Sequence, residues 1–183
     1  DGGDTLSMGI SLTGNQTIMS KNGTFAMGFF SPSGSHNWYV GIWYAQVSEK
    51  EIVWVANRES PIRNIPGVLN LSRDGHLGVY GAEGNCVWSI NGTKKVSRGV
   101  LLDSGNFFLL GADNRYETVW ESFDHPTNTW LPGMKVSKRH KLISWKNSWD
   151  PAPGLFSALQ DPSGVIQVVL MWNNSVQYWT TGV

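Results

Sequence analysis

The side chains that could do chemistry in this sequence are few and widely spaced. No two of the four histidines stand at a metal-ligand spacing, and a single cysteine, Cys86, cannot complete a zinc site. A glycosidase needs two carboxylates about 5–9.5 Å apart, whereas Glu117 and Glu121 on one strand would stand about 13 Å apart. The motifs of serine hydrolases, zinc proteases and phosphate-binding loops do not occur. We therefore expect no catalytic residue, no metal site and no cofactor in this chain.

The composition excludes two further classes of function. Fourteen Lys and Arg balance fourteen Asp and Glu, and 15% of the residues are charged, so neither nucleic acid nor an anionic membrane surface is an expected partner. Ten Trp and 21 Gly among 183 residues indicate an all-β chain with many tight turns. No apolar stretch reaches the roughly 18 residues that a membrane span needs. The lone Cys86 forms no internal disulfide, and we expect it to be buried.

Two features of the sequence each have two interpretations. A basic run is either a solvated linker or a patch that docks an acidic ligand or partner; it consists of Lys135, Lys138, Arg139, His140 and Lys141. Four tryptophans stand outside the repeats described below and are either core residues or exposed anchors at an interface; they are Trp38, Trp130, Trp149 and Trp172.

The number of N-glycosylation sequons in the sequence indicates secretion. Random placement of 14 Asn and 29 Ser and Thr would give about two Asn-x-Ser/Thr sequons. The chain has five, at Asn15, Asn22, Asn70, Asn91 and Asn173. Several fall in turn-like sequences such as Asn22-Gly23, where a bulky glycan can be carried. We therefore expect an extracellular, glycosylated protein.

The sequence contains a degenerate repeat. Three short segments share a turn followed by an apolar strand: Ser20–Phe25, Ser72–Leu77 and Leu102–Phe107. Asn-Gly, Asp-Gly and Ser-Gly at their centres are hairpin signals because glycine accepts a positive φ. A tryptophan-bearing strand follows each turn, with Trp43, Trp88 and Trp120 in turn. The repeats predict three small sheets around a common axis, with these tryptophans in one shared core. We interpret Ile52–Ala56 as an extra strand inserted in the first repeat.

The repeat pattern stops between Pro126 and Lys141, which predicts a boundary there. Beyond it the sequence predicts three strands, Leu155–Gln160, Val165–Trp172 and Ser175–Thr180, joined by turns. Such a meander is too short to be another copy of the first domain.

Five motifs together resemble, in the same order, the plant S-domain family of S-locus glycoproteins and G-type lectin S-receptor-like serine/threonine kinases. They are Trp38–Tyr44, Val53–Arg58, Leu101–Phe107, Val119–Thr127, and Trp145-Lys146 followed by Asp150-Pro151. The resemblance implies an all-β fold. Residues 1–130 would form a bulb-type lectin β-prism II of three antiparallel sheets around a pseudo-threefold axis. Residues 131–183 would form a linker and the start of a second, truncated lectin-like domain.

The resemblance also implies a function. The chain would be the extracellular ligand-recognition module of a single-pass type I receptor-like kinase at the plasma membrane, signalling in recognition or defence. ATP is expected only for a kinase domain outside this chain, and membrane contact only through a transmembrane segment outside it. The ligand class stays open between glycan, peptide and microbial metabolite. Pairing into a homodimer through the C-terminal half is expected, the alternative being a monomer whose meander folds back onto the prism. The alternative function is a secreted mannose-binding lectin.

Three segments of the sequence correspond to the sugar-binding motif of mannose-binding bulb lectins. In mannose-binding bulb lectins each sheet carries Gln-x-Asp-x-Asn-x-Val-x-Tyr, whose alternate residues face one sugar ring. The corresponding segments here are Ser20–Gly28, Ser72–Tyr80 and Leu102–Leu110. The resemblance therefore implies degenerate sugar motifs, in which Asp74, Tyr80 and Asn106 are the remaining candidates for carbohydrate binding.

Overall fold

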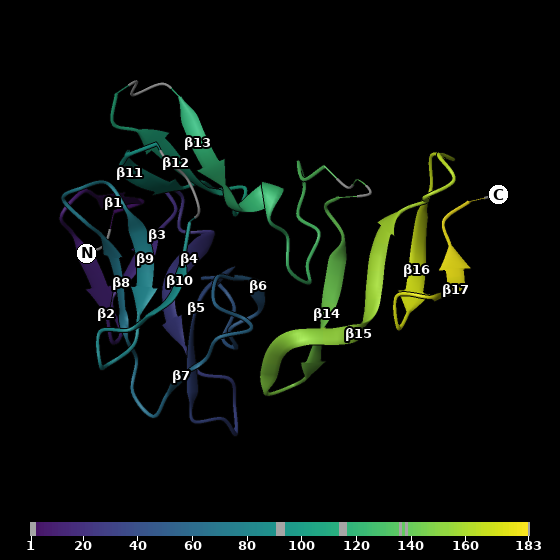
Figure 1. Ribbon diagram of the computed structural model, residues 1–183, viewed down its shortest axis with the longest axis horizontal. Helices are drawn as coiled ribbons and strands as arrows, with labels where there is room; N and C mark the ends of the chain where they lie inside the picture. The colour runs from purple at the N-terminus through teal and green to yellow at the C-terminus, as the bar shows by residue number, and fades with distance from the viewer. Residues whose placement is uncertain (1–2, 91–93, 114–116, 136, 138, 183) are drawn as a thin grey trace.

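The computed structural model describes residues 3–90, 94–113, 117–135, 137 and 139–182. Over these residues the chain forms strands and one short 3₁₀ helix, η1 (Ser122–Asp124), arranged as a prism of three sheets followed by a separate fourth sheet (Figure 1). The prediction of an all-β fold is confirmed. None of the helical structure in the described residues is long and apolar enough to cross a membrane.

Each sheet of the prism is antiparallel and contains a four-stranded ladder. The first consists of β3 (Thr17–Met19), β4 (Phe25–Phe30), β5 (Asn37–Tyr44) and β6 (Ile52–Val55), with β7 (Ile62–Arg63) also paired to β5. The second consists of β2 (Ser11–Thr13), β8 (Val68–Leu71), β9 (Leu77–Tyr80) and β10 (Cys86–Ser89). The third consists of β1 (Thr5–Ser7), β11 (Val96–Leu101), β12 (Phe107–Gly111) and β13 (Thr118–Glu121).

The three predicted hairpin turns have one geometry. In each, the glycine N–H donates to the carbonyl three residues earlier, at 2.8 Å from Gly23, 3.0 Å from Gly75 and 3.0 Å from Gly105. The three glycines have φ of +70°, +78° and +84°, a region that residues with a Cβ rarely adopt. The Asn-Gly, Asp-Gly and Ser-Gly signals therefore identified these turns correctly.

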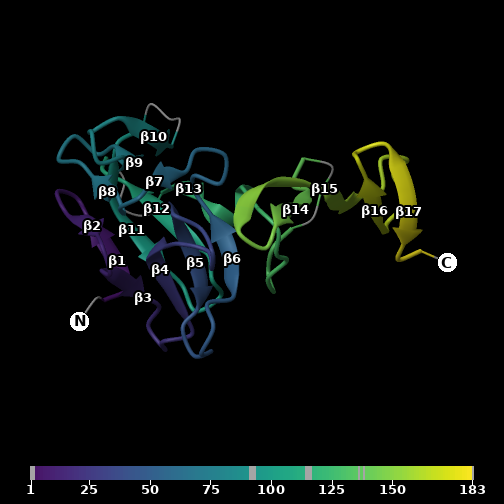
Figure 2. The same cartoon turned by 90° about the horizontal axis from the view of Figure 1, so that it is seen from below.

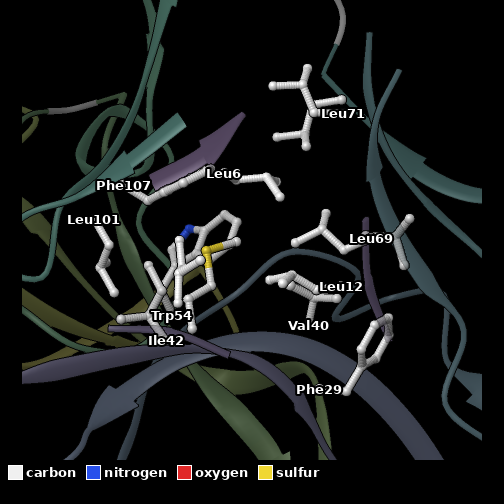
Figure 3. Close-up of a cluster of buried hydrophobic side chains, with 14 of the residues drawn as sticks. Leu6, Leu12, Phe29, Val40, Ile42, Trp54, Leu69, Leu71, Leu101 and Phe107 are labelled. Atoms are coloured by element: carbon white, nitrogen blue, oxygen red, sulfur yellow. The ribbon is translucent and has the colours of Figure 1, made fainter. Parts of the chain in front are cut away.

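Tryptophans from all three sheets meet on the prism axis. The ring centroids of Trp54, Trp88 and Trp120 lie 5.9–6.1 Å apart, with interplanar angles of 68–79°. This edge-to-face packing is favourable because the positive edge of one indole meets the negative face of the next. Figure 3 shows Trp54 among side chains that converge from the three sheets.

The prediction that Trp43 belongs to this cluster was wrong. Trp43 lies on β5 and is buried beneath the ammonium of Lys50, which sits 4.4 Å from its ring centroid. Trp54 takes the place on the axis because β6 is the fourth strand of its sheet, as β10 and β13 are of theirs. Ile52–Ala56 is therefore part of the repeat and not an insertion.

The fourth sheet consists of β14 (Leu142–Asn147), β15 (Asp150–Gln160), β16 (Val168–Trp172) and β17 (Val176–Thr180). The three predicted strands are present, and β14 was missed. β15 begins earlier than predicted because Pro151 and Pro153 lie opposite irregular pairing with β14, where a strand tolerates proline. β16 and β17 lie at the far end of the molecule from the prism (Figures 1 and 2), so the meander does not fold back. The division into domains at residue 130 stays a prediction.

Arg58 joins the prism to the fourth sheet. Its Nε donates to the carbonyl of Pro151 at 2.7 Å, and one Nη donates to the carbonyls of Ile143 and Ser144 at 3.2 and 3.0 Å. Burial lowers the pKa of the Arg58 guanidinium from its ordinary value. Beside it, Phe30 and Trp145 stack with centroids 6.3 Å apart.

The structure decides the burial of Cys86 and of the four tryptophans outside the repeats. Cys86 is exposed, so the prediction of burial was wrong. It opens β10, the edge strand of the second sheet, where side chains have few neighbours. Of the four tryptophans with two interpretations, Trp130, Trp149 and Trp172 are 50%, 56% and 46% exposed, whereas Trp38 is half-buried against the core. A role as interface anchors stays a prediction.

Candidate ligand-binding site

The first hairpin has no room for a sugar-binding tyrosine. Gly28 occupies the position of the motif tyrosine, and a Cβ there would lie 2.7 Å from the carbonyl oxygen of Gln16 and 2.9 Å from Thr17 Cγ2. Ser20, at the glutamine position, is buried, and its hydroxyl accepts the N–H of Phe25 at 3.0 Å. Both positions are thus used for packing and turn formation.

The second hairpin keeps two of the candidates, Asp74 and Tyr80. Asp74 is exposed in the turn before β9, and Tyr80 ends that strand. The ring of Tyr80 covers Gly78, where an added Cβ would lie 3.0 Å from the Tyr80 hydroxyl. In the motif of the mannose-binding bulb lectins, a valine stands at the position of Gly78. The Asp74 carboxylate therefore remains open to solvent, whereas the tyrosine packs on its own strand.

In the third hairpin, Asn106 is buried and bonded within the protein. Its Nδ2 donates to Glu121 Oε2 at 2.7 Å, and its Oδ1 accepts from the Ser122 hydroxyl at 3.1 Å and the Phe123 N–H at 3.2 Å. The amide ties the start of β12 to η1. Because Asn106 lies on a different sheet from Asp74 and Tyr80, the three candidates are not parts of one hairpin site.

A cleft of about 480 Å³ opens at the tryptophan cluster and shares no residue with the three hairpins. The indoles of Trp54, Trp88 and Trp120 line it, and the last two are half-buried. His125 stacks on Trp120 with centroids 5.1 Å apart and planes 9° apart. The carbonyl of His125 also accepts the indole N–H of Trp54 at 2.8 Å, which fixes the segment after η1 beside the cleft.

Charged side chains surround these rings. Glu59 and Asp124 contribute carboxylates, and Arg139 and Lys141 of the basic run contribute cations. Burial lowers the pKa of His125, with a further lowering by His140 and an opposing effect of Asp124. Lys135 is exposed elsewhere, and Lys138 lies outside the described residues. The sequence indicated a possible binding role only for this run, and the other motifs of the cleft served as evidence for fold and family.

The cleft has the properties of a binding site. Its indole rings, which stand edge to face, and its polar rim suit a ligand with an apolar face and several polar groups. Among the described residues, no group of three His, Cys, Asp or Glu side chains could hold a metal ion.

Four of the five sequon asparagines fall within the described residues. Asn15, Asn22 and Asn173 are exposed in turns, while Asn70 is half-buried on β8 and accepts the Ser11 hydroxyl at 3.0 Å. Asn91 lies outside the described residues.

The chain is similar to several known proteins. A family described as D-mannose binding lectin matches residues 51–149. Two G-type lectin S-receptor-like serine/threonine-protein kinases of Arabidopsis thaliana are 41% and 39% identical to the chain, each over 98% of it and over 23% and 22% of their own lengths. A solved monomeric mannose-binding lectin from Gastrodia elata covers 65% of the chain and 96% of its own, at 17% identity and a TM-score of 0.48.

The chain belongs to the D-mannose binding lectin family. Within it, the chain is similar over nearly its whole length to the G-type lectin S-receptor-like kinases, which confirms the resemblance read from the motifs. It spans less than a quarter of the length of these curated relatives.

Proposed function

We propose that the chain is the extracellular ligand-recognition module of a plant receptor-like serine/threonine kinase, signalling in recognition or defence. The observation that carries the proposal is the 41% identity to such a kinase over 98% of the chain. ATP would bind only a kinase domain outside this chain. The exposed sequons agree with an extracellular location, because glycans are added in the secretory pathway.

The hairpins support a ligand other than free mannose. Gly28 leaves no space for the tyrosine of the first motif, and Asn106 uses its amide inside the protein. Loss of two or three hydrogen bonds at about 1 kcal/mol each removes most of a weak monosaccharide affinity. We therefore propose that the three sugar motifs are degenerate, with Asp74 and Tyr80 as the least altered pair.

Two measurements test the proposal. Sequencing the transcript should show a reading frame that continues into an apolar span and a kinase domain, and the protein should be labelled at the cell surface by a membrane-impermeant reagent. A transcript that stops after the lectin region would overturn the receptor assignment.

The alternative function, a secreted mannose-binding lectin, is favoured by one observation, the exposed carboxylate of Asp74. A glycan array with parallel screens of peptides and microbial metabolites decides between the two. Micromolar binding to simple mannosides that disappears in Asp74→Ala would favour the secreted lectin.

A further inference from the structure

The size and floor of the cleft fit a short oligosaccharide. Its volume of about 480 Å³ lies within the roughly 300–1,000 Å³ of small-ligand sites. A pyranose ring presents polarised C–H bonds on one face, and these are attracted to the negative face of an indole. Trp88 and Trp120 leave part of their surface accessible, although the partly exposed ring of His125 covers one face of Trp120.

The charged side chains at the rim of the cleft favour a ligand that carries both hydroxyls and a carboxylate. Glu59 and Asp124 can only accept hydrogen bonds when ionised, and sugar hydroxyls donate them. Arg139 and Lys141 can only donate, and a carboxylate is the partner that donors of this kind bind most strongly. Across the residues that the structure describes, neither cation forms an ion pair with a carboxylate, although the Lys141 ammonium donates to Asn174 Oδ1 at 3.5 Å. Arg58 is more fully bonded, since its guanidinium donates to three carbonyls at 2.7–3.2 Å.

We propose that this cleft binds an acidic oligosaccharide, a chain of sugars bearing carboxylates, with its rings on Trp88 and Trp120 and a carboxylate on Arg139 and Lys141. The inference rests on the proposed recognition function and adds a site outside the three hairpins. A neutral glycan would leave both cations without an anionic partner. A polyphosphate would bring negative charge beside Glu59 and Asp124 without hydroxyls to donate to them.

The test is calorimetric titration of the 183-residue chain with an oligogalacturonate and with its carboxyl-reduced form, which has the same linkage and length but no charge. We expect the acidic form to bind and the reduced form to bind at least about tenfold more weakly, because the contacts to both cations are lost. Equal binding of the two forms, or binding of neither, would overturn the proposal.

Paired variants locate the site. The double variant Arg139→Gln, Lys141→Gln should lose at least about tenfold in affinity for the acidic form. The matched control Lys21→Gln, Arg73→Gln removes the same charge from exposed residues outside the cleft and should retain the affinity. Equal losses in both pairs would indicate attraction by net charge alone and would contradict the cleft site.

Different results would overturn the receptor assignment and the cleft site. Binding of mannosides that depends on Asp74, together with no binding of the oligogalacturonate, would overturn the cleft site but leave a lectin. A transcript without a kinase, together with cleft binding, would overturn the receptor assignment but leave the site.

Discussion

At the scale of single residues, substitutions of Asn106 and Asp74 should differ in their effect on stability. Asn106 is buried with three hydrogen-bond partners, and Asp74 is exposed. Asn106→Ala should lower the free energy of unfolding by about 1–3 kcal/mol, because buried partners lose their bonds. Asp74→Ala should change it by no more than about 0.5 kcal/mol. Urea unfolding followed by circular dichroism measures both, and equal small effects would show that the Asn106 bonds do not stabilise the fold.

His125 makes stability depend on pH. Its pKa is lowered from the ordinary 6.5, chiefly by burial, so the unfolded chain takes up the proton first as the pH falls. This residue's contribution to stability is therefore complete above about pH 6.5 and is lost as the pH falls through the lowered folded-state pKa. The neighbouring charges are those of Arg58, Glu59, Asp124, Arg139, His140 and Lys141.

His125→Phe tests this dependence because it keeps a ring on Trp120 and removes the titrating group. The variant should lose less stability than the parent between about pH 7 and pH 5. Thermal melts at several pH values measure the slope. Parallel slopes for the two proteins would contradict the assignment to His125.

At the scale of elements, two turn glycines form a matched pair. Gly105 and Gly84 have φ of +84° and +80°, but a Cβ at Gly105 would lie 2.7 Å from Leu131 Cδ1, whereas at Gly84 it would meet nothing within 4 Å. Gly84→Ala should cost about 1–2 kcal/mol for backbone conformation alone. Gly105→Ala should cost about 1–3 kcal/mol more, because the core around Phe25 and Leu131 must move. Similar melting temperatures for the two variants would exclude a packing role for Gly105.

The same elements show what local sequence could predict. The hairpin turns were predicted because their signals lie within two adjacent residues. Trp54 was not placed on the axis, since the long strand β5 and the loop after it put a second tryptophan, Trp43, nearer to the turn. The pairing of Thr5 with Val100 and of Ser11 with Asn70 has no local signal at all, because β1 and β2 complete sheets formed by much later residues.

The candidate site was less predictable than the fold. The cleft combines residues of β6, β10 and β13 with the segment after η1 and the basic run. The closure of three sheets around one axis brings the strands together, and the contact of the fourth sheet with the prism through Arg58 adds the basic run. The sequence marked Arg139 and Lys141 by their charge, but Glu59 and Asp124 are ordinary surface carboxylates until the fold places them in one cleft with those cations.

At the scale of the whole molecule, glycosylation tests the extracellular assignment. In a eukaryotic secretory host we expect glycans on at least three of the five sequons, which are Asn15, Asn22, Asn70, Asn91 and Asn173. Asn70 should be the least occupied of the described four, since it is half-buried on a strand. Peptide mass mapping after enzymatic deglycosylation measures occupancy. No occupied site, or a single one, would contradict secretion.

The outer part of the fourth sheet predicts self-association. Ile166, Trp172, Tyr178 and Trp179 are 96%, 46%, 52% and 50% exposed, and the net charge of zero gives no long-range repulsion between copies. We expect a weak to moderate dimer in sedimentation over a concentration series, measured with and without glycans because Asn173 lies in the β16–β17 turn.

A pair of variants locates the contact. Trp179→Lys should abolish the dimer, because a buried unpaired charge is costly. Ile65→Lys, at a residue 55% exposed on the prism, should leave it unchanged. A single monomeric species of the parent chain up to tens of micromolar would overturn the prediction.

Cys86 has a practical consequence for all these experiments. It is the one cysteine of the sequence, it is exposed, and its thiol lies 3.4 Å from the carbonyl of Trp88. A maleimide dye would therefore attach at a single position, two residues from an indole of the cleft, and tryptophan quenching of that dye would report ligand entry. The same thiol can cross-link two copies by air oxidation, so a dimer counts as non-covalent only when it persists in a reducing agent.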